Sequence, residues 1–105
     1  MPYYVYAIKL DQEILKSKKF RKQNPDLNPK LICLYVGQSY HTPEVRFKQH
    51  KKGYKSNNFV KKYGMQLCPR KYSKYNPIKT RKEAEEIEKM LTKKLRARGH
   101  GVWSN

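Results

Sequence analysis

The chain has 105 residues, a length that suits a single domain with a modest hydrophobic core. It carries 25 lysines and arginines against 8 aspartates and glutamates, which gives a formal net charge of +17 at pH 7. Because so many like charges repel one another, we expect a polyanion as the partner, and nucleic acid is the first candidate. A membrane partner is not expected, since the sequence has no apolar stretch of transmembrane length and no basic amphipathic helix with bulky apolar anchors.

The first residues lack the charged and apolar regions of a secretory signal peptide, so we expect a cytoplasmic, intracellular protein. The two cysteines, Cys33 and Cys68, do not have the spacing of metal ligands. In an intracellular protein they are expected to be reduced thiols, and we assign them no functional role.

Two strands and a long connection are predicted in the first third of the chain. Residues 3–9 (YYVYAIK) are rich in β-branched and aromatic residues, which is typical of a strand. Residues 31–37 (LICLYVG) are apolar on both faces, which predicts a central strand antiparallel to the first. Residues 11–30 contain six lysines and arginines and two prolines, so we expect a basic surface loop with room for one helical turn.

Two helices are predicted in the middle of the chain. Thr42 has the character of an N-cap, and the helix that follows should cover residues 43–52 and end at Gly53. Ser56 should open a second, short helix over residues 57–63.

The last part of the chain predicts one more strand and a long helix. Residues 65–72 form a plausible strand, which Pro69 restricts to a sheet edge or a bulge. Thr80 and Glu83 form a capping box, and the helix that they open should run to about Arg98.

This order of elements predicts an α+β fold with a small three-stranded antiparallel sheet flanked by helices. We expect one domain over residues 1–105, with the basic loop at about 11–30 as an insertion. Trp103 is expected to pack against the domain, with stacking on a nucleic-acid base as the alternative.

The last predicted helix has an apolar stripe with one acid in it. Glu88 falls on this face, between Ala84 and Leu91. An acid on the core-facing side is costly unless a partner compensates its charge, and a divalent metal or a buried base would do so. A boundary glutamate paired with one of the many lysines explains the pattern equally well.

Arg46 and His50 lie four residues apart and therefore on one face of a predicted helix. An arginine fork suits two phosphate oxygens, and a histidine can orient or relay a proton near neutral pH. A basic solvated helix face is the alternative. Tyr6 and Tyr35 lie on neighbouring strands, so two phenols can meet over one side of the sheet, although ordinary aromatic packing would also place them there.

Taken in order, these residues resemble the GIY-YIG nuclease family. The first family motif stands here as Val5-Tyr6-Ala7 and the second as Tyr35-Val36-Gly37. Arg46 matches the helix arginine of the family, His50 the histidine that several branches carry, and Glu88 the metal-binding glutamate.

Residues 93–98 (KKLRAR) are also similar to the basic tail of the excision-repair nuclease branch. The chain departs from the family pattern at three points. The first motif has valine and alanine in place of glycine and isoleucine, and Tyr6 and Tyr35 are 29 residues apart rather than joined by a short hairpin. Gln38 stands where some branches carry a lysine.

The resemblance implies an endonuclease that hydrolyses phosphodiester bonds with one Mg²⁺ or Mn²⁺ ion held by Glu88. Arg46 would clamp the scissile phosphate, and Tyr6 or Tyr35 would accept a proton from the attacking water. His50 would hydrogen-bond to that tyrosine or to the phosphate. DNA is expected rather than RNA, with a protein partner as one source of specificity.

Polar and basic side chains should track the nucleic-acid backbone, with binding that falls steeply with salt. They are Gln38, Ser39, Lys48, Lys51, Lys52, Lys55, Lys61 and Lys62. Because the charge exceeds what catalysis needs, the alternative is a non-catalytic basic nucleic-acid-binding protein on the same scaffold. A ribosome-associated basic protein, with Glu88 as an ordinary paired residue, is a third possibility.

Overall fold

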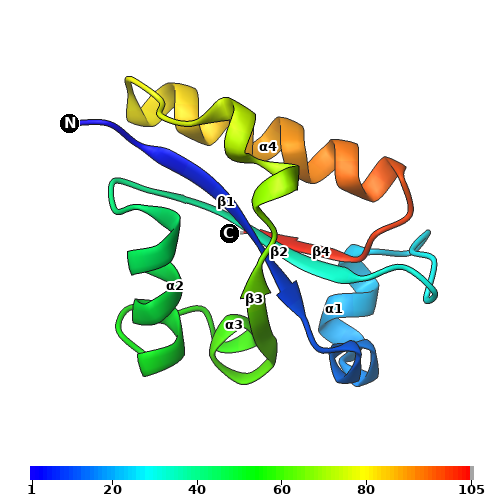
Figure 1. Ribbon diagram of the computed structural model, residues 1–105. Coiled ribbons are helices and arrows are strands. Elements are labelled where there is room, and N and C mark those ends of the chain that lie inside the picture. The colour runs from blue at the N-terminus through cyan, green and yellow to red at the C-terminus, as the bar shows by residue number, and fades with distance from the viewer. Residues whose placement is uncertain (105) are drawn as a thin grey trace.

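A computed structural model describes residues 1–104, so Asn105, the last residue of the predicted domain, lies outside the described residues. The strands are β1 (Tyr4–Leu10), β2 (Cys33–Ser39), β3 (Gly64–Leu67) and β4 (Val102–Ser104). They form one sheet in the order β3-β1-β2-β4 (Figure 1). β1 pairs antiparallel with β2 and with β3, and β4 pairs parallel with β2.

The α+β class is confirmed, but the prediction of three antiparallel strands is wrong, because the sheet has four strands and is mixed. β4 has only 3 residues, too few to show the alternation that identifies a strand. Its partner β2 is distant in the sequence, so no hairpin turn indicates the pairing.

The helices are α1 (Lys18–Gln23), α2 (Pro43–Lys52), α3 (Asn58–Tyr63) and α4 (Arg81–Ala97). Three 3₁₀ turns join them, namely η1 (Gln12–Lys16), η2 (Pro69–Lys71) and η3 (Ser73–Tyr75). In Figure 1, α4 crosses above the sheet, whereas α1, α2 and α3 lie below it. Among the described residues, none of these helices has the length and apolar character to cross a bilayer.

The helix starts follow from local capping, much as predicted. The hydroxyl of Thr42 accepts a hydrogen bond from the Val45 amide, and α2 ends at Gly53, whose φ of 87° is a left-handed value. The hydroxyl of Thr80 accepts from the Glu83 amide at the start of α4. The cap of α3 is Asn57 rather than the predicted Ser56, and its side chain accepts from the Phe59 amide.

The prediction for residues 11–30, a surface loop with room for one helical turn, is right only in part: most of the segment is exposed, but it contains η1 and α1 and contributes to the core. The side chains of Ile14 and Phe20 are fully buried. Asn24 is buried as well, and its Oδ1 accepts hydrogen bonds from the Val102 amide at 2.8 Å and from Arg96 Nε at 3.1 Å. Exposed lysines dominate the composition of the segment, so its few apolar positions did not indicate a buried side.

The third strand is shorter than predicted. β3 ends at Leu67, and Pro69 opens the turn η2 instead of continuing the strand to residue 72. β3 lies at the edge of the sheet, as the proline indicated.

Trp103 on β4 is only 8% exposed and makes an edge-to-face contact with Phe59, with ring centroids 4.7 Å apart. The packing role predicted for Trp103 is confirmed. Cys33 and Cys68 are free thiols.

Candidate active site

Two phenols meet over one face of the sheet. In the β1–β2 register Tyr6 lies opposite Gly37, and Ile8 lies opposite Tyr35, so both tyrosines share this face. Their ring centroids are 6.2 Å apart. A Cβ atom on Gly37 would lie 2.6 Å from the hydroxyl of Tyr6, so this position leaves no room for a side chain. The glycine of the second motif therefore makes space for the tyrosine of the first.

His50 of α2 packs beneath these rings and is 1% exposed. Its Nε2 lies 3.0 Å from the hydroxyl of Tyr6, and its Nδ1 accepts a hydrogen bond from the Asn57 amide at 3.3 Å. Burial, assisted by the positive charge of Arg46, lowers the pKa of His50 to about 4, so the imidazole is neutral at physiological pH. Because Nδ1 is the acceptor, the single proton resides on Nε2 and is donated to Tyr6.

Both tyrosines are protonated at neutral pH in the protein alone. Burial raises the pKa of Tyr6, and Tyr35 adds to this effect while Arg46 opposes it. Burial, followed by the charge of Glu88, raises the pKa of Tyr35 to about 12, while Arg46 and a hydrogen bond with Tyr6 act in the opposite direction. His50, Tyr6 and Tyr35 thus form a contiguous series of hydrogen-bonding groups.

Arg46 lies on α2 one turn before His50, and main-chain oxygens hold its guanidinium. Nη1 donates to the carbonyl of Tyr54 at 3.2 Å, and Nη2 donates to the carbonyl of Lys55 at 2.7 Å. Nη1 also donates to Oε1 of Gln49 at 3.1 Å. These bonds connect α2 to the loop that follows it and fix where the positive charge lies.

Glu88 extends from α4 toward the phenols. A cavity of about 220 Å³ is lined by Tyr6, Tyr35, Gly37, Gln38, Arg46, Glu85, Glu88 and Lys89, and we call it the active-site cavity. β4 stops opposite Val36, so Gly37 and Gln38, two of the three β2 residues that line the cavity, lie beyond the last parallel pair. The cavity therefore brings together side chains from β1, β2, α2 and α4.

The carboxylate of Glu88 has no hydrogen-bond or ion-pair partner among residues 1–104, although it is only partly exposed. Burial raises the pKa of Glu88 to about 7, with Glu85 adding to the shift and Lys89 opposing it. An unpaired, partly buried carboxylate is the kind of group that a bound cation would stabilise.

The donor set indicates which cation would fit. Within the described part of the chain, no cluster of three or more histidine, cysteine, aspartate or glutamate side chains is arranged to hold a metal. One carboxylate beside phenol oxygens suits a hard divalent ion that keeps most of its waters, and it does not suit zinc, which needs several nitrogen or sulfur ligands.

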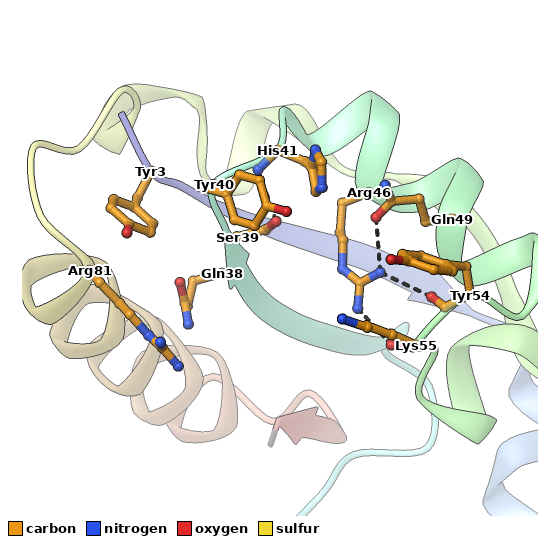
Figure 2. Close-up of a pocket in the computed structure, with 10 residues that line it drawn as sticks. All are labelled: Tyr3, Gln38, Ser39, Tyr40, His41, Arg46, Gln49, Tyr54, Lys55 and Arg81. Carbon is orange, nitrogen blue, oxygen red and sulfur yellow. Dashed lines mark hydrogen bonds between the residues drawn. The ribbon is translucent and has the colours of Figure 1, made fainter. Parts of the chain in front are cut away.

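The residues predicted to contact nucleic acid fall into different environments. Gln38 and Ser39 line a second cavity of about 280 Å³, together with Lys55. We call this second cavity the flanking pocket, and Figure 2 draws the residues that line it. Lys51 is exposed, and its Nζ donates to the carbonyls of Lys61 and Gly64, at 3.2 and 2.8 Å, so two of its three N–H donors are already engaged.

The other predicted lysines are exposed on α2 and α3. They are Lys48, Lys52, Lys61 and Lys62. Nζ of Lys62 lies 5.2 Å from the ring centroid of Tyr63.

Sequence reasoning missed the groups that support the site. The main-chain amide of Asn57 sets the tautomer of His50, and no sequence pattern identifies a main-chain donor. Tyr40 and His41 come directly after β2, and both line the flanking pocket with Tyr54. Adjacent aromatic residues after a glycine-ended strand were a usable signal for a binding surface.

A family model described as the GIY-YIG catalytic domain matches residues 2–100. Comparison with curated proteins and with solved structures finds no significant match. The family match covers nearly the whole chain, and it includes every residue of the active-site cavity. The chain therefore belongs to the GIY-YIG catalytic domain family, which is a family of nucleases and generally of metal-dependent endonucleases.

Proposed function

We propose that this protein is an endonuclease that hydrolyses phosphodiester bonds in DNA with the help of one Mg²⁺ or Mn²⁺ ion. The observation that carries the proposal is the convergence of two phenols, one arginine and one unpaired carboxylate on a single cavity. Each group has a separate use in phosphodiester hydrolysis, and a structural role for the unpaired acid is hard to find.

In the proposed reaction a water oxygen attacks the phosphorus atom, and the bond to the leaving oxygen breaks. Arg46 would bind a non-bridging oxygen, where negative charge develops. Glu88 would hold the divalent ion, which as a Lewis acid supplies further stabilisation of that charge. Because Arg46 is held by main-chain carbonyls, little reorganisation would be needed during the reaction.

We assign the general base to Tyr35. His50 donates its proton to Tyr6, which leaves the hydroxyl hydrogen of Tyr6 to be donated to Tyr35. This arrangement favours a phenolate on Tyr35, and burial raises the pKa of Tyr6 further than that of Tyr35. Tyr6 and His50 would therefore act as positioning residues that stabilise the base.

The test compares substitutions at three positions on duplex and branched DNA and on RNA, with Mg²⁺, with Mn²⁺ and with chelator. We expect Glu88→Gln to abolish cleavage, since amide oxygen is a poor substitute for a carboxylate ligand. Tyr35→Phe should lose about 10²- to 10⁴-fold in rate, the usual contribution of a general base. Tyr6→Phe should lose less and should shift the pH profile. Cleavage that survives Glu88→Gln or chelator would exclude the mechanism.

The alternative is a non-catalytic nucleic-acid-binding protein, and the net charge of +17 favours it, because catalysis alone does not require so much. Such a protein would bind DNA with strong salt dependence and release it uncut under every metal condition. Tight binding without turnover by the wild-type protein would establish this alternative.

A further inference from the structure

The flanking pocket adjoins the active-site cavity, and the two share the side chains of Gln38 and Arg46. Any group in the flanking pocket would therefore lie next to the phosphate that Arg46 contacts. We propose that the flanking pocket takes one unpaired base of the substrate, beside the phosphate that is cut. This inference rests on the proposed function and defines the class of nucleic acid on which it acts.

Aromatic side chains border the pocket and leave much of their surface exposed. Tyr40 is 54% exposed and Tyr54 is 57% exposed, and both line this cavity. The rings of Tyr40 and His41 are in contact and tilted relative to each other, with centroids 4.2 Å apart and an angle of 34° between their planes. Figure 2 shows Tyr3 and Tyr40 on one side of the pocket and Tyr54 on the other, with Arg46 between them. Exposed ring faces of this kind are the surfaces on which unpaired bases stack.

The charge of the pocket suits a nucleotide. Arg46, Lys55 and Arg81 line it, and none of its lining residues is acidic. Part of this charge is already engaged, because Arg81 Nε lies 3.1 Å from Glu85 Oε1 and Lys55 Nζ lies 5.7 Å from the ring centroid of Tyr54. Positive charge remains at the border with the active-site cavity, where Arg46 would meet the phosphate of the same nucleotide.

The pocket also offers a polar group for the edge of a base. Among the described residues, no hydrogen-bond partner is found for the side-chain amide of Gln38. An amide that carries both a donor and an acceptor can read one edge of a base. The cavity volume of about 280 Å³ lies just below the range of roughly 300–1,000 Å³ for drug-sized ligands, so it suits a single base rather than a base pair.

A base cannot occupy this pocket while it is stacked and paired in a duplex. Extruding it costs free energy, and that cost is least where the base is already unpaired. The geometry therefore favours substrates with an unpaired nucleotide at the cleaved phosphate, such as a flap, a bulge or a single strand, over a continuous duplex.

The test uses three DNA substrates of the same sequence. One is a continuous duplex, one has a single unpaired nucleotide, and one has an abasic residue at that unpaired position. We expect the wild-type protein to cleave the substrate with the unpaired base about 5- to 150-fold more efficiently than its abasic counterpart, the range that one stacked base supplies. Tyr40→Ala and Tyr54→Ala should remove most of this difference, and Tyr40→Phe should keep it. Met65→Ala, an exposed residue on β3, is the control and should behave as wild type.

A second measurement reads the contact without cleavage. 2-Aminopurine at the unpaired position should lose fluorescence when it stacks on Tyr40, with wild-type protein in chelator, and it should stay bright with Tyr40→Ala. Equal cleavage of the base-bearing and abasic substrates, or quenching that Tyr40→Ala and Tyr54→Ala leave unchanged, would overturn the inference. Failure of the proposed function gives a different result, in which the wild-type protein cuts no substrate with either metal while the quenching still reports on the pocket.

Discussion

At the scale of single residues, buried groups whose charged forms are disfavoured line the active-site cavity or, like His50, contact its lining. Burial lowers the pKa of His50 to about 4 and raises that of Tyr35 to about 12. The neutral imidazole is useful in this state, because only a neutral ring can accept from Asn57 and donate to Tyr6 at the same time. Burial thus keeps the ring neutral, and the Asn57 amide then sets the direction of its hydrogen bonds.

Glu88 provides a prediction that links the proposed metal site to stability. Burial raises the pKa of Glu88 from 4.5 to about 7, so the folded state binds more protons than the unfolded state between these values. The contribution of Glu88 to the free energy of unfolding is therefore most favourable below about pH 4.5. It is lost as the pH rises through 7, because the carboxyl then ionises in the folded state as well. In chelator at pH 8, Glu88→Gln should therefore be more stable than wild type, by about 1 kcal/mol, or roughly 4–8 °C in Tm.

The measurement is thermal unfolding of both proteins at pH 5 and at pH 8. The stabilising effect of Glu88→Gln should grow between these two values. Glu86→Gln, at an exposed position on α4, is the matched control and should show no such growth. A stabilising effect that is the same at both pH values would show that the Glu88 carboxyl titrates normally.

At the scale of elements, sequence reasoning succeeded where the signal is local. The caps at Thr42 and Thr80 lie within a few residues of the helices that they start, so both helices could be predicted. α1 could not be predicted, because its one buried side chain, Phe20, packs against Phe59 and close to Gly101, both far away in the sequence.

The same distinction applies to the candidate site. Tyr6, Tyr35, Arg46 and Glu88 could be brought together from their resemblance to the family motifs, and the structure places all four around one cavity. The flanking pocket could not be predicted, since the residue before β1, the strand β2 and the loop after it, the helix α2 and the loop after it, and α4 each contribute only one or two side chains.

Asn24 connects two elements that the sequence analysis missed. Its Oδ1 accepts from the Val102 amide of β4 and from Arg96 of α4, and its Nδ2 donates to the Phe20 carbonyl of α1. Asn24→Ala would leave these groups without their partner inside the protein. We expect a loss of about 1–3 kcal/mol in the free energy of unfolding for this reason.

Chemical denaturation of wild type, Asn24→Ala and a control variant would check this prediction. Asn28→Ala is the matched control, because Asn28 is exposed and its Oδ1 accepts only a local bond from the Lys30 amide. The control should lie within about 0.5 kcal/mol of wild type. Equal stability of Asn24→Ala and Asn28→Ala would mean that the buried bonds contribute no net stability.

At the scale of the whole molecule, the excess of positive charge is not uniformly available to a ligand. Lys51 and Lys52 are neighbours on α2, yet Nζ of Lys51 is bonded to two main-chain carbonyls. Lys52 is exposed. The structure therefore distinguishes Lys51, which links α2 to the main chain of α3 and β3, from Lys52, which makes no such bond within the described part of the chain.

Binding of DNA should accordingly depend on salt in a way that differs between these two lysines. With six or more phosphate contacts, affinity should fall by about 10³-fold or more between 50 and 200 mM salt. Lys52→Gln should reduce the slope of log affinity against log salt by about 0.9, the effect of losing one phosphate contact. Lys51→Gln should change the slope less and should lower the stability of the protein. Equal changes in slope for the two variants, measured by fluorescence anisotropy, would contradict this distinction.

The donor that fixes the proton of His50 belongs to the main chain of residue 57. Every amino acid except proline carries this donor, so the identity of the side chain there is irrelevant to the histidine. In a library of single substitutions at residue 57, only proline should disturb the proton of His50. Other substitutions should act only through the loss of the Asn57 side chain as the cap of α3. The side chain at such a position can change while the main-chain amide keeps the same effect on the chemistry.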